Sequence, residues 1–403
     1  MILHIDCNNF FVSCELVLHP ESANRPAIVA NNNESGGGII LALNKEAKSI
    51  GLKRGTPIFK AKEILAKYSV TIFQADHYRY EKFSEQVMQC VKNLDIVLDF
   101  TQYSIDEFFG SLPIDDTEEL KDCVQKIKNH INESTGIAVS CGCAQTYTLA
   151  KMATHYAKKY AGYHGICIIT PDKRERALSL LPIEDVWGIG RKTRDSMKFY
   201  GIGSALDFAS CNESFVKRNY GTTGLHTWLE LRGTPCIKLD RPKWQQSISQ
   251  SRTFAYMTDD INVLIQEISN YASACATKLR AQNTVCKSVM VIINTNRHRN
   301  DLPQYNNKAV IKLSTPCNDS PNIIKAAITA LNQIYLPKFQ YKRAGVILSD
   351  ISVNDAVQLN IFEAIYDGKQ SKLMQTIDSI NSKFGKEKIH LAIQGVKKQG
   401  KQK

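Results

Sequence analysis

The chain has 403 residues, of which 43% are hydrophobic and 22% charged, and a formal net charge of +12. This length is too great for one hydrophobic core, and no apolar run approaches the roughly 18 residues of a membrane span, so two to four globular domains are expected. The start, MILHIDCNNFF, lacks the basic segment of a signal peptide, and twelve cysteines without a CxxC pair exclude a disulfide scaffold or zinc ribbon, which indicates a reducing, cytoplasmic location.

The first 170 residues show the pattern of an α+β domain. Leaving out residues 13–75, the predicted order is β-α-β-β-α-β with one extra helix and strand, which is the ferredoxin-like order. Its strands are expected at 2–5, 96–100, 103–110, 137–143 and 166–170, and its helices at 80–94, 120–131 and 145–160. The omitted part predicts strands at 26–30 and 39–43, followed by two short helices.

The rest of the chain divides into a helical part and a second α+β part. Residues 171–240 are predicted to be mostly helical, and the proline-containing stretch 235–250 reads as a linker. Strands are then expected at 249–256, 288–294, 309–315 and 344–352, with helices at 261–279 and 321–335. After residue 354 the pattern weakens.

The positive charge is concentrated in the C-terminal part. Residues 1–240 hold 28 basic and 28 acidic side chains, whereas residues 241–403 hold 23 and 11. This distribution indicates a polyanionic partner for the C-terminal part. A solvated lysine-rich tail is the alternative for about half of the excess, because residues 383–403 hold seven lysines and one glutamate.

Three acidic residues lie where predicted strands end or turn. Asp6 ends the first strand, and Asp106 and Glu107 are adjacent in the apolar stretch YSIDEFFG. In a ferredoxin-like sheet the first strand lies beside the central hairpin, so Asp6 can face both residues. Hard oxygen ligands favour Mg²⁺, and two such ions clamp an in-line phosphoryl displacement. The sequence therefore predicts a site for two magnesium ions.

The alternative is that Asp106 and Glu107 are structural and pair with nearby lysines. Adjacent residues of a strand point to opposite faces, so this requires two separate buried partners. The metal site is the interpretation we favour.

Several stretches resemble a known family of enzymes. DCNNFFVSCE (residues 6–15), YSIDEFF and AQTYTLAKMATHYAKKY closely resemble Y-family translesion DNA polymerases. The last stretch, with VWGIGRK and LELRGTPC, is most similar to the branch formed by the catalytic subunits of bacterial DNA polymerase V (UmuC type). The resemblance covers essentially the whole chain.

The resemblance implies an α+β multidomain fold, that of a right-hand polymerase. The expected parts are a ferredoxin-like palm, small fingers, a helical thumb with a helix-hairpin-helix, a linker, an α+β little finger and a basic tail with a clamp-binding peptide. Their expected residues are 1–12 and 76–170 (palm), 13–75 (fingers), 171–240 (thumb), 241–250 (linker), 251–353 (little finger) and 354–403 (tail).

The resemblance also implies roles for individual residues of the catalytic part. Asp6, Asp106, Glu107 and the carbonyl of Cys7 would hold two Mg²⁺ ions. Phe11 matches the steric gate, a ring that leaves no room for a ribose 2′-hydroxyl; the alternative is that it fills the core. The residues expected to meet the incoming nucleotide are Phe10, Phe11, Asn44, Lys48 and Lys158. Lys48 and Lys158 can instead be solvated, and Lys151, on nearly the same helix face as Lys158, is a further phosphate candidate. Leu43 replaces a usual arginine, and the loop 31–38 is longer than in the family.

DNA and clamp contacts are expected outside the palm. GIGRK reads as a helix-hairpin-helix turn whose Gly188, Gly190, Arg191 and Lys192 approach a DNA phosphate, although such glycines also serve ordinary helix turns. In the last domain the phosphate candidates are Arg252, Arg297, Arg299, Lys342 and Arg343, any of which can be a solvated charge. QLNIF resembles a sliding-clamp peptide, with Gln358 orienting it and Leu359, Asn360, Ile361 and Phe362 completing it.

The implied activity is template-directed, error-prone addition of dNTPs to a primer 3′-hydroxyl on damaged templates, as part of the SOS response. A fingers insert of about 60 residues is too small for a large lid, which weakens induced-fit selection. Implied partners are primer–template DNA, dNTPs, a sliding clamp, a dimer of a cleaved accessory subunit and a recombinase filament, with no membrane. The alternatives are a DNA polymerase IV-type enzyme, a nucleotide cyclase and a non-catalytic DNA-binding scaffold.

Overall fold

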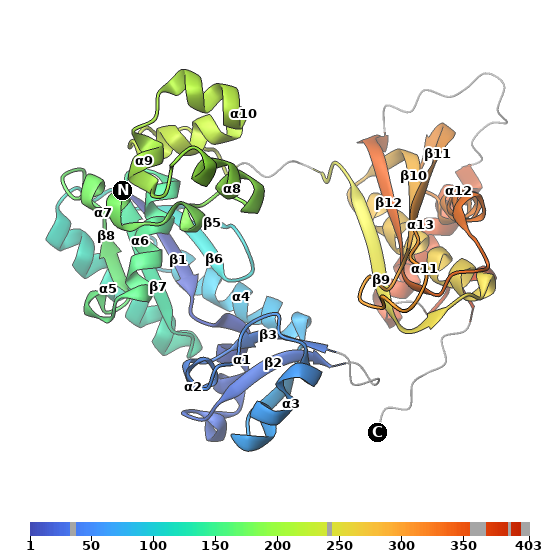
Figure 1. Ribbon diagram of the computed structural model, residues 1–403, viewed down its shortest axis with the longest axis horizontal. Coiled ribbons are helices and arrows are strands. Elements are labelled where there is room, and N and C mark those ends of the chain that lie inside the picture. Colours follow the sequence, from blue (N-terminus) through green and yellow to red (C-terminus); the bar gives the residue numbers. More distant parts are fainter. Residues whose placement is uncertain (33–37, 240–243, 355–367, 386–387, 396–403) are drawn as a thin grey trace. The chain divides into compact units, whose positions relative to one another are not determined.

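The computed structural model describes residues 1–32, 38–239, 244–354, 368–385 and 388–395 (Figure 1). It consists of two compact units, Met1–Asp240 and Arg241–Lys403, and each is treated by itself below. No helix among the described residues is long and apolar enough to cross a membrane.

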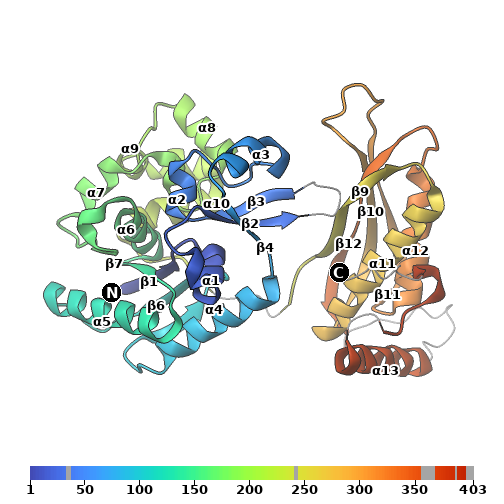
Figure 2. The same ribbon diagram turned by 90° about the horizontal axis from the view of Figure 1, so that it is seen from below.

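A five-stranded sheet forms the centre of the first unit, with strand order β5-β6-β1-β7-β8. β1 runs antiparallel to β6 and β7, and β7 runs parallel to β8. Helices α4 and α5 cover one face and α6 covers the other (Figures 1 and 2). This is the predicted ferredoxin-like arrangement. The elements are β1 (Ile2–Cys7), α4 (His77–Lys92), β5 (Leu98–Gln102), β6 (Glu107–Ser111), α5 (Thr117–Thr135), β7 (Val139–Ala144), α6 (Tyr147–Lys159) and β8 (Ile166–Ile168).

The alternation of β1 decides which of its side chains meet which helices. Leu3 and Ile5 are fully buried in the core that includes α4 and α5. His4 and Asp6 point to the opposite face, because successive side chains of a strand alternate. Asp6 therefore faces α6.

A smaller sheet of order β3-β2-β4 is inserted after β1. Its third strand, Thr71–Gln74, pairs in parallel with β2 and was missed by the sequence analysis, because four residues bounded by a helix and a turn carry little periodic signal. The elements are α1 (Phe10–Leu18), β2 (Ala27–Asn32), β3 (Gly38–Leu43), α2 (Lys45–Ser49), α3 (Ile58–Lys67) and β4 (Thr71–Gln74).

Four helices complete the first unit and are called the four-helix region here. They share one core cluster with α6. Glu230, which is fully buried, fastens the region to α6: its Oε2 accepts a hydrogen bond from Thr148 N at 2.9 Å, in the first turn of that helix. The helices are α7 (Arg174–Leu180), α8 (Arg191–Phe199), α9 (Ala205–Ala209) and α10 (Glu213–Leu231), the last kinked at Gly221.

The second unit contains a four-stranded antiparallel sheet of order β11-β10-β12-β9. Helices α11 and α12 pack on it through one large core cluster. The predicted α+β pattern is therefore present. Its elements are β9 (Ile248–Thr258), α11 (Ile261–Ala281), β10 (Thr284–Thr295), β11 (Asn306–Cys317), α12 (Ser320–Ile334) and β12 (Tyr341–Val353).

The chain after residue 367 departs from the expectation of a weakly patterned basic tail. Residues Gly368–Phe384 form a helix, α13, and Ala392–Gln394 form a short 3₁₀ turn. Arg280 of α11 fastens α13 through two hydrogen bonds to Asp378, at 2.6 and 2.8 Å. Gln394 is 5% exposed, and its carbonyl accepts from the Asn270 side chain. This segment is thus an integral layer of the second unit.

We expect Asp378→Ala to release α13 from α11. The Arg280 side chain is only 11% exposed and that of Asp378 is 26% exposed. Removing the partner of such a partly buried charge should lower the free energy of unfolding by about 1–3 kcal/mol. Hydrogen exchange should quicken in α13 and stay unchanged in β10 and β12. Lys372→Ala, at an exposed position of the same helix, is the matched control. Unchanged protection of α13 in the Asp378 variant would contradict this role.

Candidate active site

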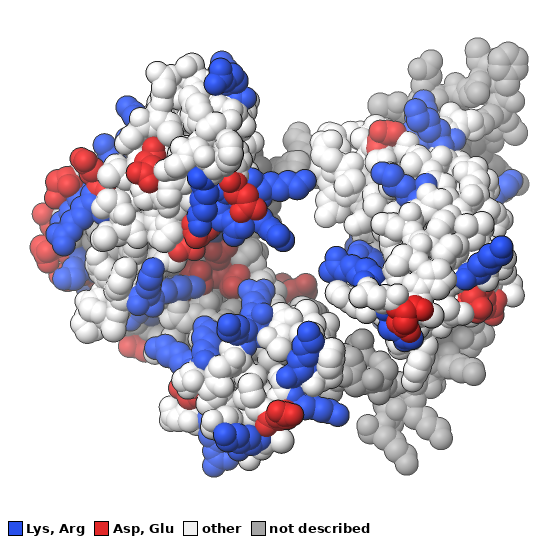
Figure 3. Space-filling model, viewed as in Figure 1, with Lys and Arg blue, Asp and Glu red and all other residues white. Residues whose placement is uncertain are grey.

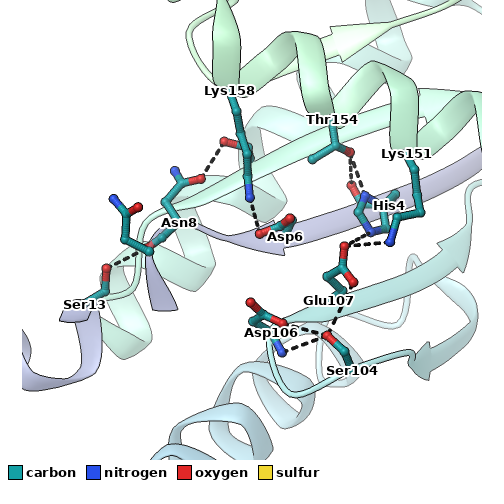
Figure 4. A network of polar contacts seen from close by, with 12 residues as sticks. His4, Asp6, Asn8, Ser13, Ser104, Asp106, Glu107, Lys151, Thr154 and Lys158 are labelled. Atoms are coloured by element: carbon teal, nitrogen blue, oxygen red, sulfur yellow. Dashed lines mark hydrogen bonds and ion pairs between the residues drawn. The ribbon is translucent and has the colours of Figure 1, made fainter. Parts of the chain in front are cut away.

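Asp6 and Glu107 lie on the α6 side of the sheet, and Asp106 lies in the bend beside Glu107 (Figure 4). Asp6 lies directly opposite Glu107 in the pairing of β1 with β6. The carbonyl of Asp106 accepts a hydrogen bond from Cys7 N at 2.9 Å. The expected juxtaposition of strand end and hairpin is observed, with one difference: β6 begins at Glu107, so Asp106 belongs to the bend before the strand.

Two lysines of α6 lie against these carboxylates. Lys158 forms an ion pair with Asp6, and Lys151 Nζ donates to Glu107 Oε1 at 2.7 Å. Seven residues are about two helical turns, so both lysines share one face of α6. Lys151 therefore contacts a carboxylate in this structure, where the sequence analysis offered it as a phosphate ligand. Asp106 differs, since its Oδ1 accepts from Ser104 Oγ at 2.7 Å.

The close approach of α6 to the sheet depends on Gly142 in β7. A Cβ atom there would lie 2.3 Å from Thr154 N and 2.4 Å from Ala150 O, so any other residue would push the helix away. Gly142 pairs with His4 of β1, and the His4 Nδ1 lies 2.8 Å from Thr154 Oγ1. Glycine at this position thus brings both lysines of α6 within reach of the carboxylates.

The carboxylates of Asp6 and Glu107 have pKa values that are shifted in opposite directions. Burial raises the pKa of Asp6, and the repulsion of Glu107 and Asp106 adds to it, so that the pKa is about 6 despite Lys158. Burial also disfavours the charge of Glu107, but His4 and Lys151 outweigh it and lower the pKa to about 2. Burial lowers the pKa of His4 to about 4, so its imidazole is neutral near pH 7.

The donor atoms fit hard divalent cations, although the site is arranged around lysines. Among the described residues no three carboxylate, imidazole or thiol groups converge as a ready ligand cluster. The oxygens of Asp6, Asp106 and Glu107 nevertheless share one edge of the sheet with the backbone of Cys7, and their charge needs two ammonium groups to balance it. Mg²⁺ prefers such oxygens.

Phe10 and Phe11 at the start of α1 point in different directions. Phe10 is 3% exposed and belongs to the core, so a nucleotide could meet only its backbone. Phe11 is half-buried and stacks on Tyr80 with ring centroids 4.4 Å apart. The Tyr80 hydroxyl donates to Glu15 Oε1 at 2.7 Å, and Arg79 Nη1 donates to Glu15 Oε2 at 2.9 Å. The buried Glu15 thus fixes the ring on which Phe11 rests.

Asn44 and Lys48 have different surroundings. Asn44 is 6% exposed; its Oδ1 accepts from Ala47 N and Ala27 N, and its Nδ2 donates to a backbone carbonyl. Asn44 thus caps α2, the helix that carries Lys48, and its contact with the nucleotide stays a prediction. Lys48 Nζ donates to Asn9 Oδ1 at 2.7 Å, beside the first turn of α1. Partial burial, and then the charges of Lys158 and Lys45, lower the pKa of Lys48.

The glycine turn lies at the start of α8. Gly188 has φ +88°, a left-handed conformation that favours glycine, and Gly190 is the residue before the first turn of α8. Arg191 and Lys192 are exposed on that turn, and basic side chains gather over α8 in Figure 3. The N-terminus of α8 has no side-chain cap, which leaves its first N–H groups suited to a phosphate.

A cavity of about 280 Å³ lies between α6 and the segment before the glycine turn. Its wall includes the two carboxylates, the two lysines and Trp187. The carboxylates are therefore accessible from the side of the four-helix region.

The basic residues of the second unit that are expected to contact DNA differ in whether their side chains are already bonded to other groups of the protein. Arg299 is held by Asp301 at 2.5–2.7 Å, which reduces its availability. Lys342 Nζ donates to Ala255 O, and Arg343 donates to Ser251 Oγ, so both lie along the pairing of β12 with β9. The set occupies two neighbouring strands and the β10–β11 connection: Arg252, Lys342, Arg343, Arg297 and Arg299. The clamp residues Gln358, Leu359, Asn360, Ile361 and Phe362 lie outside the described residues.

Sequence analysis missed the polar residues that support the site. Glu15, His4, Thr154 and Glu230 carry no catalytic pattern of their own. Only burial reveals them, since each is at most 2% exposed while polar or charged.

Family models match most of the chain. The impB/mucB/samB family matches residues 5–155, and the C-terminal domain of the same family matches residues 245–361. A domain of unknown function (DUF4113) matches residues 371–403, which include most of α13.

Individual proteins align over nearly the full length. Protein UmuC of Salmonella typhimurium is 34% identical over 399 residues, which cover 98% of this chain and 93% of that protein. Protein ImpB of Salmonella typhimurium is 33% identical, covering 97% and 92%. DNA polymerase IV 2 of Halalkalibacterium halodurans is 26% identical, covering 98% and 94%. Among solved structures, a Y-family DNA polymerase chimera has a TM-score of 0.69 at 24% identity and covers 88% of this chain and 99% of its own, a likeness of fold.

Proposed function

Because this chain belongs to the impB/mucB/samB family of Y-family translesion DNA polymerases, we propose that it adds dNTPs to a primer 3′-hydroxyl by two-metal nucleotidyl transfer. We also propose that it does so with low fidelity on damaged templates, in the cytoplasm, as part of the SOS response. The greater identity to UmuC-type proteins than to DNA polymerase IV proteins favours the polymerase V branch.

The observation that carries the proposal is that Asp6 and Glu107 lie opposite each other on one face of the sheet, with Asp106 in the adjoining bend and Lys158 against Asp6. Asp6, Asp106, Glu107 and the Cys7 carbonyl would hold two Mg²⁺ ions. Bound there, the ions would polarise the primer hydroxyl and neutralise charge on the departing pyrophosphate. Lys158 would then exchange Asp6 for a triphosphate oxygen, and Lys48 would meet the same phosphates. The N-terminus of α1 has no side-chain cap, which leaves its first N–H groups suited to an anion.

Phe11 is proposed as the steric gate for the sugar. Its ring is held by stacking on Tyr80, whose hydroxyl is fixed by Glu15. A ring held in place by stacking excludes by bulk, so the absence of a tyrosine hydroxyl at this position does not remove the effect.

The remaining parts of the fold are proposed to bind DNA. The five-stranded sheet with its helices is the palm, the β3-β2-β4 sheet the fingers, the four-helix region the thumb, and the second unit the little finger. Gly188, Gly190, Arg191 and Lys192 would contact the DNA backbone without reading sequence. A sliding clamp, a dimer of a cleaved accessory subunit and a recombinase filament are proposed partners.

Asp106→Asn tests the polymerase against a non-catalytic DNA-binding scaffold. We expect primer extension with Mg²⁺ to fall at least about a hundredfold, because the variant loses a charged metal ligand. Binding of primer–template DNA, followed by fluorescence anisotropy, should be unchanged. Asp115→Asn, at an exposed position nearby, is the control. Full extension by the Asp106 variant would contradict the proposal.

Phe11→Leu tests the sugar gate. We expect ribonucleotide incorporation, relative to deoxyribonucleotide incorporation, to rise about ten- to a hundredfold, because the smaller side chain leaves room for a 2′-hydroxyl. Single-nucleotide insertion kinetics with dNTP and rNTP measure this ratio. Phe73→Leu, a half-buried aromatic position in β4, should leave it unchanged. Equal discrimination in the Phe11 variant and the parent would remove the assignment.

Replacing Leu359, Ile361 and Phe362 by alanine tests the clamp peptide. Stimulation of primer extension by a sliding clamp should disappear, because these side chains are the proposed apolar anchors. Extension on naked DNA should persist, and Asn360→Ala should retain stimulation. If the triple variant responds to the clamp like the parent, the peptide does not bind it.

A further inference from the structure

Three aromatic rings surround the Lys151 ammonium and are called the aromatic cage here. Its Nζ lies 4.6 Å from the Tyr103 ring centroid, 5.3 Å from that of Trp187 and 5.9 Å from that of Phe109. The rings also contact one another, with centroids 5.6 to 6.2 Å apart. An ammonium over the faces of aromatic rings is stabilised by their quadrupoles, most strongly where water is excluded. The Lys151 side chain is only 15% exposed.

The aromatic cage joins three parts of the chain that are distant in sequence. Phe109 lies on β6, Tyr103 in the bend before it, and Trp187 immediately before the glycine turn of the four-helix region. Trp187 Nε1 donates to the Tyr103 hydroxyl at 3.3 Å, and Tyr103 N donates to the carbonyl of Glu107 at 2.9 Å. The glycine turn is therefore linked to the strand that carries Glu107.

The two lysines of α6 differ in how firmly they are held. The Lys158 side chain is 34% exposed, more than twice the value for Lys151. Lys151 has the aromatic cage on one side and the Glu107 carboxylate on the other. Lys158 is accordingly free to move to a phosphate, whereas Lys151 stays with Glu107.

We propose that Lys151 is a positioning residue that orients the Glu107 carboxylate and couples it to the glycine turn through Trp187. The position of the turn on DNA then sets the orientation of a carboxylate at the reaction centre. Lys151 acts through Glu107 and does not contact the nucleotide. The inference rests on the proposed function, which it extends to a further residue. Of its two tests, only the kinetic one requires the chain to be an active polymerase.

The first test observes Trp187 in the full chain by ¹⁹F NMR after labelling with 5-fluorotryptophan, without metal, nucleotide or DNA. The chain has three tryptophans, and the Trp187 signal is the one that Trp187→Phe removes. We expect Glu107→Gln to shift this signal, because Lys151 loses its anchor. In a Lys151→Met background the same Glu107→Gln change should leave the signal in place. This comparison is a double-mutant cycle, which isolates coupling between two sites.

The signals of Trp228 and Trp244 are the internal controls, since unchanged positions show that each variant is folded. Lys159→Met, which removes a neighbouring charge of α6, should leave Trp187 unmoved. The proposal would be overturned if Glu107→Gln left the Trp187 signal unshifted. It would also be overturned if Glu107→Gln shifted the signal equally in the parent and in the Lys151→Met background. This part of the test stands even if the chain extends no primer.

The second test separates positioning from phosphate binding. We expect Lys151→Met to lower kcat for nucleotide addition about tenfold or more with an unchanged KM for dNTP, because it alters an interaction of the reaction centre only. Lys158→Met should instead raise KM. A raised KM with unchanged kcat in the Lys151 variant would make it a phosphate ligand and overturn the inference.

Discussion

The site depends on a balance of charge between one face of the sheet and the helix that covers it. Asp6 and Glu107 lie opposite each other on the α6 side, and α6 supplies one lysine for each. A partly buried carboxylate without a cation would cost several kcal/mol. A buried ion pair is itself weak evidence of stability, and the Lys158–Asp6 pair accords with the proposed exchange of that lysine for a metal ion. Gly142 permits it, because any Cβ there would separate helix and sheet.

The compensating positive charge is greater at Glu107 than at Asp6, and this difference suits the different roles proposed for the two carboxylates. Glu107 has two cationic or polar neighbours and a pKa of about 2, so it remains an anion at any working pH. Asp6 has one exposed lysine and a pKa of about 6. A strongly held carboxylate keeps its orientation, whereas a weakly compensated one accepts a new cation readily. Lys158, the lysine proposed to leave Asp6, is also the one proposed to bind the triphosphate.

Much of this was predictable from the sequence where a period or an apolar neighbourhood carries the signal. The strands around Asp6 and Glu107 follow from alternation, and the meeting of the two residues follows from the ferredoxin-like order. Asp106 was placed inside a strand because Phe108 and Phe109 extend the apolar pattern, although the backbone turns before Glu107. Helix α13 was missed because part of what fixes it, the Arg280–Asp378 ion pair, joins residues 98 positions apart, which no local pattern reveals.

The residues that sequence could not assign are those whose partners are distant in the chain. Trp187 meets Lys151 across 36 positions of sequence, and Glu230 meets the first turn of α6 across 82. Neither spacing is a motif, since the entropic cost of a connecting segment grows only slowly with its length, so that many lengths are tolerated. The buried Glu230 and the shared apolar core together hold the four-helix region on α6, where Trp187 lies over Lys151. The contact of Trp187 with Lys151, and through it the proposed orientation of Glu107, therefore depends on packing between segments that are distant in the sequence.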